Sequence, residues 1–145
     1  MKEKASVTTI TVNIHSSDGI TTEIGGRGKG KLVAERAPRI GTQGGMGYGG
    51  GEILSFAAGV CFYNNVRRLA NDRGIFLKTI EVEVIAETSG DPPTTREITI
   101  KPKIETDASK SEIQDVIAQA LEESYVADML THSVDVSLGL ADVAE

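Results

Sequence analysis

Three short stretches near the start of the chain alternate β-branched residues with polar ones, and turn-forming residues separate them. The stretches are residues 7–14, 20–24 and 31–35, separated by the Ser-Ser-Asp-Gly run at 16–19 and the glycine-rich run at 25–30. Alternation with period two bounded by such residues is typical of β-strands joined by tight turns. The chain is therefore expected to open with three antiparallel strands.

Residues 52–71 are predicted to form a helix that is buried on several sides. The helix follows a glycine-rich loop, and Gly74 provides a stop signal after it. Its first half is apolar nearly all round, which indicates a central position in the fold. The apolar residues of this half are Ile53, Leu54, Phe56, Ala57, Ala58, Val60 and Phe62.

From Lys78 onward the period changes to two again. Ile80, Val82 and Val84 alternate with glutamates, and after the turn at 91–94 a second strand continues the alternation with isoleucines at 98, 100 and 104. A strand with one apolar and one charged face covers a core on one side and meets water on the other. This region is therefore expected to form a second hairpin.

A second helix and a final strand are predicted for the C-terminal part. Ser109 and Glu112 have the spacing of a capping box, and the apolar residues at 113, 116, 117, 120 and 121 then lie on one helical face. Ser124 falls on that same face. Residues 133–138 alternate again, with Val134, Val136 and Leu138 expected to point inward. The resulting order, βββ-α-ββ-α-β, indicates an α+β protein with helices on antiparallel sheet.

The length and composition indicate a single domain over residues 1–145. The chain has 39% hydrophobic residues, which is enough to form one core. With 145 residues it is too short for two domains that each bury a core of their own. A helix that is apolar on several faces has too little sheet of its own to cover it in a domain this small. We therefore expect a homodimer.

Charge and hydropathy exclude two classes of partner. The formal net charge is −6, and the basic residues form no continuous stripe, so nucleic-acid binding is not expected. No stretch offers the roughly 20 apolar residues that cross a membrane, and the start lacks the apolar region of a signal peptide. A single cysteine forms no intrachain disulfide. These features predict a soluble cytoplasmic protein.

The glycine-rich loop before the first helix raises an alternative. Residues 45–50 match the G-x-G-x-x-G pattern of dinucleotide-binding loops. That fingerprint opens directly off a strand and leads to a continuously apolar parallel strand, whereas here a strand-breaking segment precedes the loop and the next strand alternates with glutamates. We favour a flexible or close-packed connection into the helix, and expect no nucleotide cofactor.

The chemistry-bearing residues are few. His15 and His132 have no metal-ligand spacing with each other, and Cys61 has no cysteine partner, so no metal site is expected. No serine lies in a nucleophile-elbow motif. Cys61 itself has two interpretations: free cysteine is often buried as a small hydrophobe, and it is also a nucleophile when it is ionised and accessible.

Two neighbouring segments carry a family motif: the first runs from Pro38 to Gly45, and the second is Gly51-Glu52-Ile53-Leu54-Ser55-Phe56-Ala57-Ala58-Gly59-Val60-Cys61-Phe62. Together they resemble the OsmC/Ohr family of thiol peroxidases. The resemblance extends over most of the chain from about Lys31, including a following strand at 75–86 and a last helix and strand at 121–136. It implies an intertwined homodimer with two interface sites. In that family each site uses a reactive cysteine, a resolving cysteine, an arginine and a glutamate.

Cys61 corresponds to the family's peroxidatic cysteine, but the other positions depart from the pattern. The resolving cysteine falls on Ser124. The glutamate falls on a glycine, with Glu52 adjacent to it, and the arginine has two candidates, Arg27 and Arg39.

The resemblance therefore implies a hydroperoxide reductase of oxidative-stress defence that uses Cys61 and an external thiol reductant, with no cofactor. The alternative is a noncatalytic dimer that binds an apolar small molecule in an interface pocket. In both cases the pocket around Cys61 is expected to include Tyr48, Phe56, Phe62 and Ser124.

Overall fold

The computed structural model describes residues 10, 13–15, 22–25, 32–34, 49–92, 94–132 and 134–141. The chain divides into two compact units, residues 1–53 and 54–145, and each is described by itself. The elements are β1 (Asn13–His15), β2 (Thr22–Gly25), β3 (Leu32–Ala34), α1 (Gly50–Asp72), β4 (Leu77–Ser89), β5 (Thr94–Thr106), α2 (Lys110–Glu122) and α3 (Tyr125–Thr131).

The first unit contains the antiparallel sheet that the N-terminal alternation predicts. Its strand order is β1-β2-β3, with Ile14 opposite Ile24 and Glu23 opposite Val33. Apart from residue 10, the remaining positions of the three predicted stretches lie outside the described residues. The antiparallel α+β class is confirmed.

Helix α1 begins two residues before its predicted start and ends one residue after its predicted end. At its start the carboxylate of Glu52 accepts a hydrogen bond from the Gly49 N–H at 3.2 Å, which satisfies a backbone donor that has no partner within the helix. At its end Gly74 has φ +68°. This left-handed conformation suits glycine and stops the helix, as the sequence predicts.

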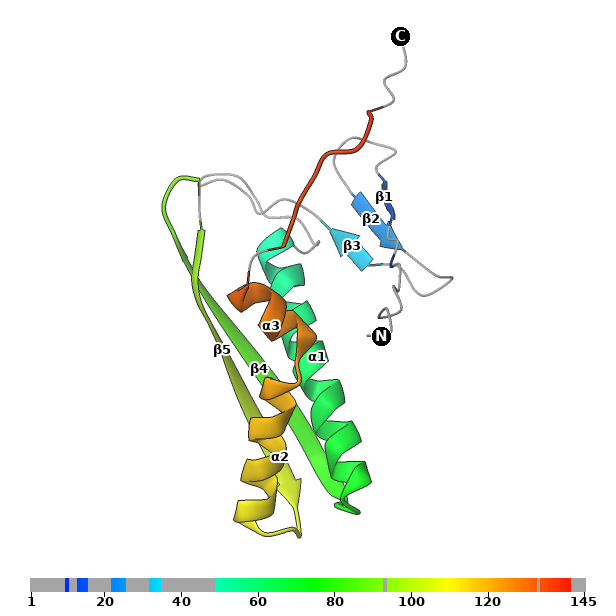
Figure 1. The fold of residues 1–145 in the computed structure, drawn as a ribbon, viewed down its shortest axis with the longest axis vertical. Coiled ribbons are helices and arrows are strands. Elements are labelled where there is room, and N and C mark those ends of the chain that lie inside the picture. The colour runs from blue at the N-terminus through cyan, green and yellow to red at the C-terminus, as the bar shows by residue number, and fades with distance from the viewer. Residues whose placement is uncertain are drawn as a thin grey trace, which may run out of the picture. The chain divides into compact units, whose positions relative to one another are not determined.

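Strands β4 and β5 form a long hairpin (Figure 1). One of its faces is apolar and the other is charged. On the apolar face Ile80 lies opposite Ile104 and Val84 lies opposite Ile100. On the other face glutamates 81 and 83 lie opposite lysines 103 and 101, and opposite charges in such cross-strand positions stabilise the pairing. The predicted second hairpin and its division of faces are confirmed.

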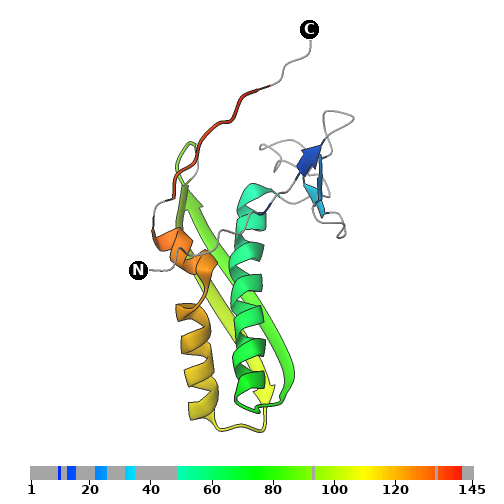
Figure 2. The same ribbon diagram turned by 45° about the vertical axis from the view of Figure 1, so that its right-hand side comes forward.

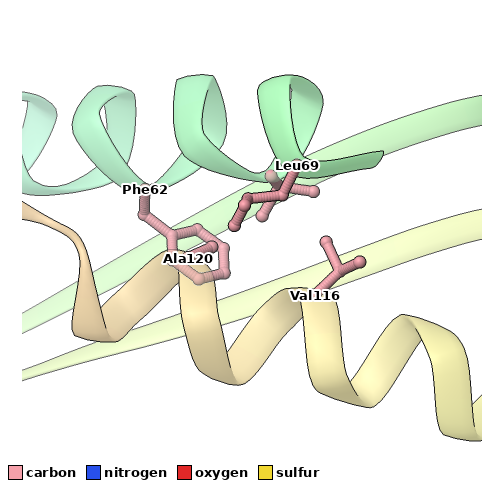
Figure 3. Packing of buried hydrophobic residues seen from close by; sticks show 5 residues of the cluster. Phe62, Leu69, Val116 and Ala120 are labelled. Carbon is pink, nitrogen blue, oxygen red and sulfur yellow. The ribbon is translucent and has the colours of Figure 1, made fainter. Parts of the chain in front are cut away.

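Helices α1 and α2 lie side by side along the apolar face of the β4–β5 hairpin (Figures 1 and 2). Phe62 of α1 packs toward Ala120 of α2, with Leu69 and Val116 further along the same interface (Figure 3). The core cluster consists of Phe62, Val66, Leu69, Val116 and Ala120, and it is covered by the partly buried residues Ile75, Leu77, Ile80, Val82, Ile100, Ile104 and Ile117.

The predicted capping box at the start of α2 is present. The Ser109 hydroxyl accepts a hydrogen bond from the Glu112 N–H, and the Glu112 carboxylate accepts one from the Ser109 N–H at 2.9 Å. The Glu112 carboxylate also accepts a hydrogen bond from the Ser109 hydroxyl at 2.9 Å, and the two bonds that it accepts, that from the Ser109 backbone first, hold the pKa of Glu112 below its ordinary value.

The end of α2 differs from the prediction. The helix stops at Glu122, so Ser124 is not on it, and a third helix that the sequence does not predict follows at once. Ser124 is the N-cap of α3: its backbone is extended and its hydroxyl accepts a hydrogen bond from the Ala127 N–H at 3.3 Å. Serine is a strong N-cap residue, and this local bond competes with continuation of α2.

The predicted final strand is also wrong. Residues 134–141 form no strand, and Val136 and Leu138 expose 92% and 95% of their surface instead of pointing inward. The alternation of apolar and polar residues is real, but a strand exists only where its backbone pairs with a neighbour. Within the described residues the chain offers this segment no such pairing.

Candidate functional site

Cys61 lies on a stripe of α1 that faces the region where α2 ends and α3 begins. The stripe consists of residues 54, 58, 61, 65 and 68, spaced by three and four positions so that they share one helical face. Asn65 donates a hydrogen bond from Nδ2 to the Ala120 carbonyl oxygen at 3.1 Å, and Arg68 forms an ion pair with Glu123. Cys61, one turn before Asn65, is a free thiol and partly buried.

Ser124 lies at the junction of α2 and α3, four residues after the Ala120 carbonyl that accepts the hydrogen bond from Asn65. Helices α1 and α2 run in opposite directions (Figure 2), so one turn back from Asn65 on α1 corresponds to one turn onward from Ala120. On α1 this step leads to Cys61, and on the other side it passes the end of α2 at Glu122 and reaches the α2–α3 junction, which contains Ser124. Ser124 is almost completely buried, with 1% of its surface exposed. We therefore expect the two side chains to lie at the same level of the helix pair.

A cavity of about 400 Å³ adjoins this region. Leu54 and Ala58, which precede Cys61 on its own stripe, contribute to the wall, and Leu121 and Ala127 flank Ser124 in the chain. The cavity is at the small end of the range for ligand pockets and is mainly apolar. The remaining lining residues are Thr95, Arg96, Glu97, Ile98 and Ile100 of β5 and Leu130 and Thr131 of α3.

Charged side chains near the end of α2 are paired with one another. Glu123 accepts hydrogen bonds from Gln119 Nε2 at 2.7 Å and from Arg68 Nη2. These bonds, that from Gln119 first, hold the pKa of Glu123 below its ordinary value. At the cavity, Arg96 donates from Nε to the Ser89 hydroxyl oxygen at 2.6 Å.

Of the other predicted site residues, the structure describes Glu52, Phe56 and Phe62. Arg27, Arg39 and Tyr48 lie outside the described residues. Glu52 is exposed and binds the Gly49 N–H at the start of its own helix. Phe56 is exposed over 47% of its surface, whereas Phe62 is 2% exposed and belongs to the core between α1 and α2. Neither phenylalanine lines the cavity of Leu54 and Ala58.

Sequence reasoning missed most of the cavity wall. The residues of α3 were missed because this helix was not predicted, and Leu54 and Ala58 were assigned only to the core-facing surface of α1. Their spacing to Cys61, seven and three positions, was a usable signal, because residues so spaced share a helical face.

Two kinds of feature are absent from the part of the chain that the structure describes. It holds no group of three or more His, Cys, Asp or Glu side chains that could bind a metal ion. Nor is any of its helices long and apolar enough to cross a membrane.

The family of the protein follows from a sequence match that contains the Cys61 helix, the β4–β5 hairpin and the α2–α3 junction. The model of the family described as OsmC-like protein matches residues 42–139. This chain belongs to the OsmC-like family. A search of curated protein sequences finds no significant match.

Solved structures of OsmC-like proteins share the fold at low sequence identity. The OsmC-like protein of Mycoplasma pneumoniae is 15% identical with a TM-score of 0.72, over 86% of this chain and 88% of that one. An organic hydroperoxide resistance protein OsmC of Legionella pneumophila is 16% identical with a TM-score of 0.60, over 87% and 91%. An organic hydroperoxide resistance protein of Elizabethkingia anophelis is 13% identical with a TM-score of 0.65, over 86% and 89%.

Proposed function

We propose that this OsmC-like protein is a thiol-dependent hydroperoxide reductase with Cys61 as its nucleophile. The observation that carries the proposal is the position of Cys61: the thiol is partly buried, one turn from the cavity-lining Ala58 on the same face of α1. Membership of the OsmC-like family supports it, as do the structural neighbours from Legionella pneumophila and Elizabethkingia anophelis that are described as organic hydroperoxide resistance proteins.

The first half of the proposed reaction oxidises the cysteine. The Cys61 thiolate attacks the terminal oxygen of the hydroperoxide, a sulfur–oxygen bond forms, and the oxygen–oxygen bond breaks. The departing alkoxide takes a proton from water and leaves as an alcohol. Sulfur has then lost two electrons and carries the hydroxyl group as a sulfenic acid. Arg27 or Arg39 is the proposed cation that favours the thiolate, with Glu52 as the acidic residue of the site.

The second half returns the cysteine to its thiol form. Cys61 is the only cysteine of the chain, so an intramolecular disulfide is impossible. An external thiol attacks the sulfenic sulfur, water leaves, and a mixed disulfide forms; a second thiol then releases Cys61 by exchange. The proposed reductant is therefore a small thiol or dithiol. A compartment that supplies it is reducing, which agrees with the cytoplasmic location expected from the sequence.

The proposed substrate is an organic hydroperoxide. The cavity wall next to the Cys61 stripe consists largely of aliphatic side chains such as Leu54, Ile98 and Leu130. Burial of an apolar substituent there contributes binding energy that hydrogen peroxide lacks. We assign no direct contact with the substrate to Tyr48, Phe56 or Phe62. In the proposal they belong only to the surroundings of the Cys61 thiol.

A homodimer is part of the proposal. Val60 on α1 exposes 55% of its surface, and the valines and leucines of residues 134–140 are exposed as well. Apolar surface of this kind is typical of surfaces that another chain covers. A second copy would complete the cover of α1 and of the site beside it.

The proposal is tested by steady-state consumption of cumene hydroperoxide with dithiothreitol as reductant. We expect turnover by the unmodified protein and none above the uncatalysed rate for the Cys61→Ser variant, whose fold is checked by circular dichroism. Turnover with hydrogen peroxide should be slower. Equal consumption by the Cys61→Ser variant would refute the assignment.

A noncatalytic binding protein is the second candidate, and the same cavity favours it. An apolar pocket binds apolar molecules whether or not a thiol beside it reacts. Saturable binding of an apolar fluorophore, displaced by cumyl alcohol, together with no peroxide turnover, would support this candidate over the reductase.

A further inference from the structure

Asn65 is a polar residue on the stripe of α1 that carries Cys61. Its side chain is partly buried, and its Nδ2 donates to the carbonyl oxygen of Ala120, a residue with no exposed surface. This bond fixes the amide at the interface between α1 and α2. The amide of its sequence neighbour Asn64, by contrast, is exposed.

The amide nitrogen of Asn65 has a donor to spare. An asparagine side chain carries two N–H groups, and the Ala120 carbonyl oxygen takes one of them. Side chains four positions apart on a helix have Cβ atoms roughly 5–6 Å apart, and each leans toward the N-terminal end of the helix. Asn65 therefore leans over the turn that contains Cys61.

We propose that the second N–H of Asn65 donates to the sulfur of Cys61 once the thiol has lost its proton, and so stabilises the thiolate. The structure shows no hydrogen bond between the two side chains, but a neutral thiol is a weak acceptor and its anion a strong one. Because the bond to Ala120 already orders the amide, little further entropy is lost when the sulfur accepts.

The charged groups that face this region are already engaged. Arg68, one turn beyond Asn65, pairs with Glu123 and lies near Asp72. From β5, Arg96 donates to the Ser89 hydroxyl, with Glu97 beside it at the cavity. Within one turn of Cys61 on α1, Asn64 is exposed, whereas the amide of Asn65 is held in place by its hydrogen bond to the Ala120 carbonyl oxygen.

The inference rests on the proposed role of Cys61, but its test needs no peroxide. Alkylation of Cys61 by iodoacetamide measures the thiolate directly, because only the ionised form reacts. We compare the unmodified protein with Asn65→Leu and Asn65→Asp, and use Asn71→Leu, at an exposed position of α1 ten residues from Cys61, as the matched control. At about pH 7 we expect roughly tenfold slower alkylation for both Asn65 variants, the size of one charge-assisted hydrogen bond, and an unchanged rate for the control.

A second pH separates thiolate stabilisation from altered access. At about pH 10 nearly every thiol is ionised, so the rates of all four proteins should converge if the amide acts on ionisation. Equal alkylation of the Asn65 variants and the unmodified protein at pH 7 would overturn the inference, and so would a rate difference that persists at pH 10. Slow alkylation with convergence, in a protein without peroxide turnover, would keep the inference and reject the reductase.

Discussion

At the residue scale, Gly59 marks a close approach between α1 and strand β4. A Cβ atom at this position would lie 2.8 Å from Cγ2 of Val84, and Gly59 is buried. Valine is branched at Cβ and has little freedom to move its methyl groups away. The absence of a side chain thus allows the helix that carries Cys61 to lie close to β4.

We expect Gly59→Ala to destabilise the protein although alanine is the better helix former. Alanine gains about 1 kcal/mol of helix propensity, whereas overpacking a buried contact costs typically 1–3 kcal/mol, so the net loss should be roughly 1 kcal/mol. Thermal unfolding followed by circular dichroism measures it. The control is Gly51→Ala, where a Cβ meets nothing within 4 Å and the melting temperature should not fall. A higher melting temperature for Gly59→Ala would contradict the packing described for this helix.

At the element scale, α1 was predicted from a first half that is apolar nearly all round, but Phe56 and Val60 of that half are exposed in the chain. Hydrophobic periodicity predicted the β4–β5 hairpin and the start of α2, because each buries one regular face against a neighbour. It failed at the α2–α3 junction for a local reason. Ser124 continues the apolar face of α2 in spacing, and it is also a good N-cap. A buried residue at this position fits both a longer α2 and an N-cap of a new helix. The spacing of apolar residues alone therefore could not show that α2 ends before Ser124. Asn65 likewise appears in the sequence as an ordinary helix residue until its bond to Ala120 is seen.

If Cys61 and Ser124 face each other across the helix pair, as we propose, a disulfide can be engineered between these positions. In a Ser124→Cys variant, stoichiometric peroxide should produce a disulfide between Cys61 and the new thiol, because a nearby thiolate captures the sulfenic acid. Such a bond requires Cα atoms within about 7 Å. Non-reducing mass spectrometry of peptides detects it. Turnover with dithiol reductants should rise as well.

Ser111→Cys is the matched control for this disulfide. Residue 111 lies in the exposed first turn of α2, and thirteen residues separate it from position 124, roughly 20 Å for a continuous helix. Its thiol should remain unpaired within the same chain. If Ser124→Cys gave no more intrachain disulfide than Ser111→Cys, the helix register inferred from Asn65 and Ala120 would be wrong.

At the scale of the whole molecule, the exposed apolar side chains are the basis of the proposed homodimer. We expect light scattering at micromolar concentration to give twice the mass of the chain, because exposed side chains such as Val60 gain by burial against a second copy. Val60→Glu should shift the protein toward monomer by placing a charge in that interface. Ala118→Glu, on the exposed face of α2, is the control and should leave the dimer intact. A monomeric unmodified protein would contradict the prediction.

The C-terminal segment shows what a sequence cannot reveal about the whole molecule. Alternation at 134–138 correctly identifies residues able to form a strand, yet the pairing of a strand depends on an edge supplied from elsewhere. The family, by contrast, was recognisable from the Cys61 helix and its preceding loop, and the match over residues 42–139 confirms it. The residues of a motif are neighbours in the sequence and can be recognised there. The edge that pairs with a strand and the wall of a cavity are formed by residues that are distant in the sequence.

The central claim is that peroxide oxidises Cys61 as a nucleophile, and the mass of the intact protein after one equivalent of cumene hydroperoxide tests it most directly. The account predicts a product that has gained one oxygen atom, formed faster than on a free thiol such as glutathione, and trapped by dimedone at Cys61. The Cys61→Ser variant should gain nothing. Oxidation of Cys61 no faster than of free glutathione would contradict the account.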